Sequence, residues 1–270
     1  MKSFIADKNR KLSKLALNNF DDLSFTLLSK AFKKKDVKVN GKRVSKDVDL
    51  VVGDVVEIYY QPLNIEKYSV VFSDSNVLVV NKNSGFTSES VFEDVKNKNH
   101  DARFIHRLDR NTSGLMIFAL NEMAEKDLLF GFKNRTFTKK YQALVKGTPK
   151  SKQAILTAYL LKDKENSFVK IYDNHVKGSV EIKTGYKIIA KDKDTSLLEV
   201  ELFTGKTHQI RAHLAYIGHP IVGDGKYGDF AFNEKTGQKT QNLTATELKL
   251  TFKLDDYLSY LDGKTFKIES

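Results

Sequence analysis

Patterns typical of strands and of helices follow one another in this chain without regular alternation. Strand patterns cover residues 76–82, 137–146 and 198–202, and a helical pattern follows residue 204. A parallel sheet covered by helices on both faces requires strands and helices to alternate along the chain. The order of the patterns therefore predicts an α+β fold with a mixed, mainly antiparallel sheet.

Charge and composition narrow the class of protein. The 270 residues include no cysteine, which excludes disulfide frameworks and thiolate metal sites. Residues 1–62 carry 13 lysine and arginine residues and 8 acidic residues, so this quarter of the chain holds +5 of the net charge of +11. A basic surface favours polyanions, because each phosphate contact releases condensed counterions. Nucleic acid is thus a candidate partner, although charge alone fits a role in solubility equally well.

The sequence shows no targeting or membrane signal. No run of 18 apolar residues occurs, and the first residues lack the apolar core of a signal peptide. We expect a cytoplasmic protein with no membrane partner.

The N-terminal quarter reads as a small separate module. Ser24 is a candidate cap for a helix from Phe25 to about Lys34. Asn40-Gly41 between alternating apolar residues predicts a hairpin, because both turn positions need a positive φ. Residues 51–58 read as a further strand pair. Gln61-Pro62 marks the boundary, which predicts domains over residues 1–62 and 63–270.

An acidic residue between two arginines is the main chemical signal. In the stretch from His106 to Gly114, Arg107 lies two residues before Asp109, and Arg110 directly follows it. Arginine stays charged and cannot act as a base, so Asp109 is the group here that could be a nucleophile or base. The alternative is a salt-bridged loop aspartate before a strand.

The stretch His106-Arg107-Leu108-Asp109-Arg110-Asn111-Thr112-Ser113-Gly114 resembles the catalytic motif of the RluA-type pseudouridine synthases. Residues 137–147 and 204–228 resemble the second and third motifs of that family. The resemblance implies that Asp109 is the catalytic aspartate, that Tyr141 stacks on the target base, and that Arg211 pairs with Asp109. It also implies a central RNA-binding cleft in the larger domain.

The same resemblance implies isomerisation of uridine on a nucleotide flipped out of the RNA. Arg107 would enter the vacated space, and Tyr141 and Leu214 would sandwich the base above an apolar floor that includes Ile210. His106 is assigned to RNA binding. Lys82 either reaches the RNA backbone or shapes the site. Whether Asp109 attacks carbon directly or assists glycal formation stays open.

The N-terminal module resembles the S4 RNA-binding domain, with most of the likeness in the Val-x-Val-Asn-Gly-Lys stretch. The resemblance implies RNA contacts from Lys34, Lys38, Lys42 and Arg43. Where that family commonly has Arg-Leu-Asp, this chain has Lys11-Leu12-Ser13, so the first helix is the weakest assignment. The alternative is a small cap with a solvated lysine face.

The resemblance implies no cofactor and no metal, since the isomerisation needs no external atom. Gly205-Lys206-Thr207 is no phosphate-binding loop, because position 200 is Val200, so no nucleotide cofactor is expected. Large-subunit (23S) ribosomal RNA is the expected substrate, transfer RNA is the alternative, and we expect a monomer. Two other functions stay open, a non-catalytic ribosome-assembly protein and a hydrolase, although the latter usually needs a second carboxylate.

Overall fold

The computed structural model describes residues 1–20, 22–60, 66–163 and 168–268. The chain divides into two compact units, Met1–Glu66 and Lys67–Ser270. The predicted boundary at Gln61-Pro62 lies outside the described residues. None of the described helices is long and apolar enough to cross a membrane.

The N-terminal unit combines helices with short strands around its own core. Strands β1, β6, β3 and β4 form an antiparallel sheet in that order, and β2 pairs with β5. Leu12, Leu28 and Ile58 are fully buried in the core between helices and sheet. The elements are β1 (Lys2–Ile5), β2 (Arg10–Lys11), α1 (Leu12–Asn19), α2 (Phe25–Lys34), β3 (Val37–Val39), β4 (Lys42–Val44), β5 (Asp49–Leu50) and β6 (Val55–Ile58).

Local signals in the sequence place α2 and the hairpin that follows it. The backbone N–H of Leu27 donates a hydrogen bond to the side chain of Ser24 at 3.1 Å, which caps the first turn of α2. Asn40 and Gly41 have φ values of +49° and +76°, as a two-residue hairpin turn requires. The predicted helix and the predicted hairpin are confirmed.

The predicted strand pair over residues 51–58 is wrong in its first half. Val55–Ile58 forms β6, whereas Val51 and Val52 are exposed in a turn. The carboxylate of Asp54 accepts a hydrogen bond from the backbone N–H of Val51 at 2.8 Å. Bonds of this kind between a side chain and the local backbone compete with strand pairing.

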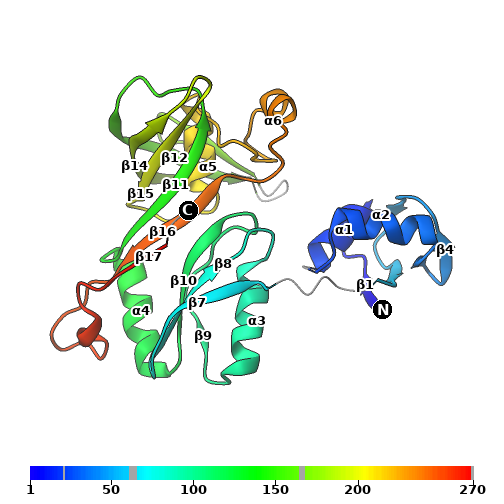
Figure 1. The fold of residues 1–270 in the computed structure, drawn as a ribbon, viewed down its shortest axis with the longest axis horizontal. Helices are drawn as coiled ribbons and strands as arrows, with labels where there is room; N and C mark the ends of the chain where they lie inside the picture. The colour runs from blue at the N-terminus through cyan, green and yellow to red at the C-terminus, as the bar shows by residue number, and fades with distance from the viewer. Residues whose placement is uncertain (21, 61–65, 164–167, 269–270) are drawn as a thin grey trace. The chain divides into compact units, whose positions relative to one another are not determined.

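The larger unit is built on one large sheet (Figure 1). In the described residues the strand order is β13-β12-β14-β15-β11-β16-β10-β8-β7, with β9 beside β10 and β17 beside β16. The elements are β7 (Tyr68–Ser73), β8 (Val77–Lys82), α3 (Ser88–Lys98), β9 (Arg103–Phe104), β10 (Ser113–Ala119), α4 (Glu122–Asn134), β11 (Thr138–Lys146), β12 (Gln153–Asp163), β13 (Phe168–Tyr172), β14 (Val180–Lys191), β15 (Thr195–Leu202), α5 (Gln209–Tyr216), α6 (Phe230–Thr236), β16 (Leu243–Lys249), the 3₁₀ helix η1 (Ser259–Leu261) and β17 (Thr265–Lys267).

Strand directions in this sheet match the predicted fold class. β10 runs parallel to β16, and the other named pairs of the described sheet are antiparallel. The predicted mixed, mainly antiparallel sheet is therefore confirmed.

Helices α3 and α4 cover opposite faces of the part of the sheet that contains β8 and β10 (Figure 1). Successive side chains of a strand point to opposite faces. On β10, Met116 and Phe118 belong to the core that includes α3, whereas Leu115 and Ile117 belong to the core that includes α4. Ile210 of α5 belongs to the α3 core, so α5 and α3 lie on the same face.

Gly114 allows β10 to approach β16 closely. Its φ is +113°, and a Cβ added here would lie 2.3 Å from the carbonyl oxygen of Ala245. Only glycine satisfies both conditions. The parallel pairing of Ser113 with Thr244 and of Gly114 with Ala245 therefore depends on this residue. The loop that precedes Ser113 carries Asp109.

Candidate active site

Asp109 lies on the loop that joins β9 to β10. Ser88, the first residue of α3, holds this loop: its hydroxyl donates to the carbonyl of Leu108 at 2.9 Å and accepts from the N–H of Leu108 at 2.8 Å. The N–H of Thr112 donates to the carbonyl of Asp109 at 3.0 Å. The backbone is thus fixed on both sides of the carboxylate.

Lys82 fixes the same loop from the end of β8. The side chain is fully buried, and its ammonium donates to the carbonyls of Asn83, Phe86 and Arg110 at 3.1, 2.8 and 3.0 Å. An ammonium has three N–H donors, and each has a backbone acceptor here. This burial contradicts the predicted contact of Lys82 with the RNA backbone. The other predicted role, shaping the site, agrees with the geometry.

Arg211 of α5 joins Asp109 to a second carboxylate. Nη1 of Arg211 donates to Oδ2 of Asp109 at 2.8 Å. Nε and Nη2 donate to the two carboxylate oxygens of Asp224 at 2.7 and 2.9 Å. Asp224 is fully buried and also accepts hydrogen bonds from the backbone N–H groups of Lys226 and Tyr227. The structure therefore brings Asp109 and Arg211 together, 102 residues apart in the sequence.

Electrostatic interactions keep Arg211 and Asp224 charged. Burial lowers the pKa of Arg211, but hydrogen bonds and charge from Asp224 and Asp109 outweigh it and raise the pKa above its ordinary value. Burial raises the pKa of Asp224, but Arg211 outweighs it and lowers the pKa. Charge-assisted bidentate bonds of this kind are strong and directional. Asp224 therefore sets the plane of the guanidinium that faces Asp109.

Tyr227 orients His208, which precedes α5. The hydroxyl of Tyr227 accepts a hydrogen bond from the backbone N–H of Val169 at 2.9 Å and is hydrogen-bonded to Nδ1 of His208 at 3.0 Å. Nε2 of His208 lies 3.9 Å from Oδ2 of Asp109. Burial lowers the pKa of His208 to about 4 against the opposing charge of Asp109, so the ring is neutral at pH 7. The φ of His208 is +55°, an unfavourable value for a residue with a Cβ.

A cavity of about 460 Å³ is lined by Asp109 and Arg211. This volume lies within the range of small-molecule sites in proteins. The wall of the cavity combines the carboxylate with aromatic, apolar and basic side chains. Within the described residues, no group of three or more histidine or acidic side chains is placed to hold a metal ion.

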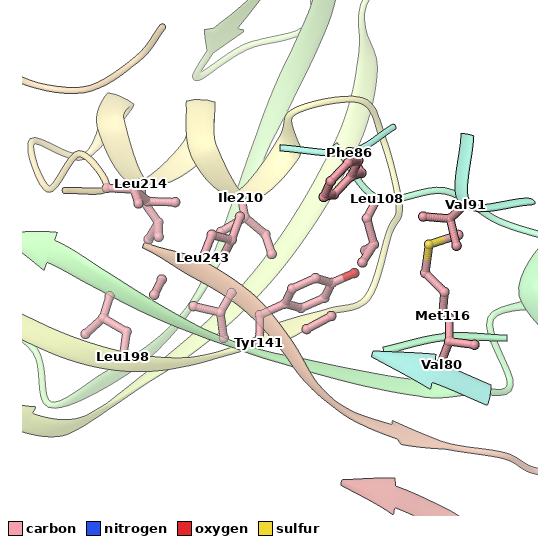
Figure 2. Close-up of a cluster of buried hydrophobic side chains, with 14 of the residues drawn as sticks. Val80, Phe86, Val91, Leu108, Met116, Tyr141, Leu198, Ile210, Leu214 and Leu243 are labelled. Atoms are coloured by element: carbon pink, nitrogen blue, oxygen red, sulfur yellow. The ribbon is translucent and has the colours of Figure 1, made fainter. Parts of the chain in front are cut away.

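Tyr141 of β11, Ile210 of α5 and Leu243 of β16 belong to the apolar part of this wall (Figure 2). Burial, together with the negative charge of Asp109, raises the pKa of Tyr141 well above its ordinary value, so the phenol keeps its proton at neutral pH. The predicted contact of Leu214 with a base stays a prediction that the structure does not favour. Leu214 is fully buried in the core and is not part of the cavity wall. It lies one turn beyond Ile210, and Leu243 takes the apolar position instead.

His106 and Arg107 line the cavity in different ways. Nε2 of His106 accepts a hydrogen bond from the N–H of Ile117 at 3.1 Å, and the ring stacks on Phe132 with 4.4 Å between centroids. Burial, with a smaller effect of the Lys139 charge, lowers the pKa of His106 to about 3. Arg107 is exposed and lies 3.3 Å from the carboxylate of Glu89. Arg107 is therefore the more available of the two to a ligand.

The basic residues predicted to bind RNA in the N-terminal unit lie on its surface. Lys34, Lys42 and Arg43 are exposed. Lys38 is half-buried, with its ammonium 4.0 Å from the carboxylate of Glu57. Their contacts with RNA stay a prediction.

Sequence reasoning missed three members of the site, Asp224, Tyr227 and His208. Asp224 and Tyr227 lie in the stretch 219–228 that carries part of the family resemblance, which was the available signal. His208 lies three residues before Arg211, a spacing that places two side chains near one another on a helix, and this spacing was the available signal. The contacts among the three depend on the tertiary fold.

The comparison with protein families gives one match across the site. Residues 76–216 match the family model described as RNA pseudouridylate synthase. This segment includes Asp109, Tyr141 and Arg211.

Relatives of known sequence are similar over most of the chain. "Ribosomal large subunit pseudouridine synthase C" of Vibrio parahaemolyticus is 31% identical over 257 residues, which cover 85% of this chain and 80% of the relative. The protein of the same name from Salmonella typhimurium is also 31% identical and covers 84% of this chain and 80% of the relative. "Uncharacterized RNA pseudouridine synthase YlyB" of Bacillus subtilis is 30% identical, with 82% and 80% covered.

Solved structures show the same fold. Human RNA Pseudouridylate Synthase Domain Containing 1 aligns with a TM-score of 0.62 at 24% identity and covers 78% of this chain and 94% of that chain. Human RNA Pseudouridylate Synthase Domain Containing 4 aligns with a TM-score of 0.58 at 21% identity, with 67% and 84% covered.

Proposed function

Since this chain belongs to the RluA-type family of RNA pseudouridine synthases, we propose that it isomerises a uridine of large-subunit ribosomal RNA with Asp109 as the nucleophile. The single observation that carries this proposal is the placement of Asp109. Its carboxylate lines a cavity of about 460 Å³ and accepts a hydrogen bond from the guanidinium of Arg211 at 2.8 Å. The buried carboxylate of Asp224 holds that guanidinium in place. The choice of ribosomal RNA follows the names of the relatives.

The reaction exchanges one bond to the ribose for another. The bond from N1 of uracil to C1′ breaks, the base turns, and a bond from C5 to C1′ forms. N1 gains a proton and C5 loses one, so the atoms balance without a redox step or a cofactor. An ionised carboxylate at C1′ stabilises the ribose after the first bond breaks. The hydrogen bond from Arg211 holds the carboxylate of Asp109 in place, so that its negative charge faces the ribose.

The target nucleotide has to leave the RNA stack to reach Asp109, at a cost of a few kcal/mol. Tyr141 provides an aromatic face for the uracil, and base–aromatic stacking is worth about 1–3 kcal/mol. Ile210 and Leu243 support the other apolar contacts of the base. Arg107, exposed beside the cavity, fills the space that the base vacates.

The N-terminal unit acts in this proposal as an S4-like RNA-binding domain. Its exposed Lys34, Lys42 and Arg43, together with Lys38, contribute phosphate contacts. The support is the basic character of residues 1–62 and the helix–hairpin order that the sequence predicted.

Comparing pseudouridine maps of total RNA from cells with and without the gene tests the substrate. The expected result is the loss of one or a few sites in large-subunit ribosomal RNA. Loss confined to transfer RNA would replace the proposed substrate with the alternative one. Unchanged maps of every RNA would overturn the proposed function.

Asp109→Asn is expected to abolish pseudouridine formation while RNA affinity changes little. The amide cannot act as a nucleophile, and affinity comes mainly from phosphate contacts. The measurement compares single-turnover product formation and Kd on the same RNA. Product formation by the purified variant at a rate near that of the wild type would show that Asp109 is not the nucleophile.

A further inference from the structure

Besides Arg107 and Arg211, four basic residues line the cavity: Lys133, Arg135, Lys139 and Lys206. We call this group the cationic wall. Lys133 lies in the last turn of α4, Arg135 is the C-cap of that helix, Lys139 is on β11, and Lys206 precedes α5. Lys133, Arg135 and Lys206 are exposed, and Lys139 is half-buried. The wall belongs to the same cavity as Asp109, so a ligand that reaches Asp109 passes close to several positive charges.

The cationic wall lacks acidic partners. Among the described residues, no carboxylate lies within the 4.0 Å ion-pair distance of any of its four members. The neighbouring Lys140 differs: it lies outside the cavity, 3.6 and 3.9 Å from the carboxylates of Glu199 and Glu247. The two consecutive lysines of β11 therefore differ in their surroundings. Lys140 is paired with acidic side chains, whereas Lys139 lines the cavity without an acidic partner among the described residues.

Two residues of the wall, Lys139 and Arg135, lie in unfavourable surroundings. Burial, and next to it the charge of Arg135, lowers the pKa of Lys139. Arg135 has a φ of +61° as the C-cap of α4, a position that favours glycine. Unfavourable charge proximity and backbone strain of this kind cluster at functional sites. An anion between the two side chains would relieve the electrostatic part.

The strand geometry relates the wall to the base-binding residue. Lys139 and Tyr141 are two residues apart on β11, on either side of an irregularity in the pairing with β16, and both line the cavity, so their Cα atoms are separated by about 6–7 Å. Within a nucleotide, one sugar separates the base from its phosphate. A uracil stacked on Tyr141 thus brings a neighbouring phosphate towards Lys139.

We propose that Lys139 and Arg135 form a subsite for the phosphodiester group adjacent to the uridine that enters the cavity. Lys133 and Lys206 add positive potential around it. This inference rests on the proposed function and extends it to the backbone of the substrate. The chemical class of the ligand is a phosphodiester anion, which an arginine fork and a lysine ammonium both bind well.

The first test uses Lys139→Gln with Lys140→Gln as the matched control, both in the full chain. Binding of a short oligouridylate is measured over a range of salt concentrations. For single strands, the slope of log K against log salt falls by about 0.7 for each phosphate that the protein no longer neutralises. We expect that decrease for Lys139→Gln and no change for Lys140→Gln. Equal slopes for the two variants would overturn the subsite.

The second test identifies the phosphate. RNA carrying the mapped target uridine is made with a neutral methylphosphonate on its 5′ or its 3′ side. The wild type is expected to lose affinity for one of the two RNAs, and Lys139→Gln is expected to lose no more, because the contact is already absent. Independent, additive losses would show that Lys139 binds elsewhere.

Thermal unfolding separates a binding role from a structural one. Lys139→Gln removes a charge that lacks an acidic partner, so its midpoint is expected to equal or exceed that of the wild type. A lower midpoint with an unchanged salt slope would make Lys139 a structural residue. If the wild type forms no pseudouridine but the oligouridylate results hold, the proposed function fails while the phosphate subsite stands.

Discussion

At the scale of single residues, Arg211 divides its N–H donors unequally. Two go to the buried Asp224 in a bidentate pair, and one goes to Asp109. The bidentate pair fixes the guanidinium plane, while the single bond to Asp109 leaves that carboxylate directed at the cavity. Removing one partner of a buried ion pair typically costs about 3–5 kcal/mol, which makes Asp224 a structural condition for the site as well as an electrostatic one.

Tyr227→Phe is expected to reduce kcat and leave RNA affinity unchanged. The substitution keeps the ring but removes the hydroxyl that links Val169 to Nδ1 of His208. The other ring nitrogen of His208, Nε2, lies 3.9 Å from the carboxylate of Asp109, so a misoriented ring disturbs that carboxylate. Losing one such bond costs about 1 kcal/mol, which corresponds to roughly a fivefold decrease in rate. Single-turnover kinetics and Kd on the same RNA measure the two effects.

Nitrogen-15 NMR of the His208 ring measures which ring nitrogen carries the hydrogen in the wild type and in Tyr227→Phe. The wild type should show one tautomer, and the variant a mixture of both. If the variant keeps the single tautomer, another group orients His208 and the link through Tyr227 is wrong.

Buried His213 predicts a loss of stability in acid. Its Nδ1 lies 3.0 Å from the hydroxyl of Thr184, and burial lowers its pKa to about 4. The unfolded chain, with a pKa near 6.5, therefore takes up the proton first, so stability is complete above that pH and declines as the pH falls towards 4. The expected contribution is about 2 kcal/mol lost by pH 5.

Urea unfolding at pH 7.5 and pH 5 tests this for His213→Asn, whose amide can still bond Thr184. The variant should lose less stability between the two pH values than the wild type. His100→Asn, at an exposed position, is the control and should behave as the wild type. Identical pH dependence in all three proteins would contradict the prediction.

At the scale of elements, local chemistry made some features predictable. The cap at Ser24 and the turn at Asn40-Gly41 act within a few residues, so their signals are complete in the sequence. The helix of Arg211 was also predicted. Leu214, predicted to contact the base, is buried outside the cavity wall, because helical spacing gives a shared face but not where the cavity ends along it. That limit is set by β16, which contributes Leu243.

Gly114→Ala is expected to destabilise the larger unit by about 2–5 kcal/mol. About 1–2 kcal/mol comes from the positive φ, and the rest from the contact of the new Cβ with the carbonyl of Ala245. Urea unfolding measures the change. Gly225→Ala is the control, because a Cβ there meets no atom within 4 Å, and it should change stability by less than about 0.5 kcal/mol. Equal stabilities of the two variants would show that β10 and β16 separate without cost.

At the scale of the whole molecule, the separate cores of the two units suggest a division of labour. The larger unit holds every member of the candidate site, and the N-terminal unit holds a large share of the excess positive charge. The charge and the helix–hairpin order of the sequence predict a separate N-terminal module, and its role in RNA binding stays a prediction. The pairing of Asp109 with Arg211 was accessible only through family resemblance, because 102 residues separate the two.

Removing residues 1–66 is expected to weaken RNA binding and to reduce its salt dependence, because the shortened protein neutralises fewer phosphates. The larger unit should still form pseudouridine at high enzyme and RNA concentrations. Kd values over a salt series and end-point conversion measure both outcomes. A truncated protein with the salt slope of the full chain would show that the N-terminal unit makes no phosphate contacts.

The buried ammonium of Lys82 has a practical consequence for following motion at the active site. Because its three donors are bonded to backbone carbonyls inside the protein, amine-reactive reagents can modify it only when the turn after β8, which provides the carbonyls of Asn83 and Phe86, or the loop that carries Asp109 opens. The acylation rate of this one lysine, read by mass spectrometry, thus reports how often the backbone around the candidate active site opens in the native enzyme, with and without bound RNA.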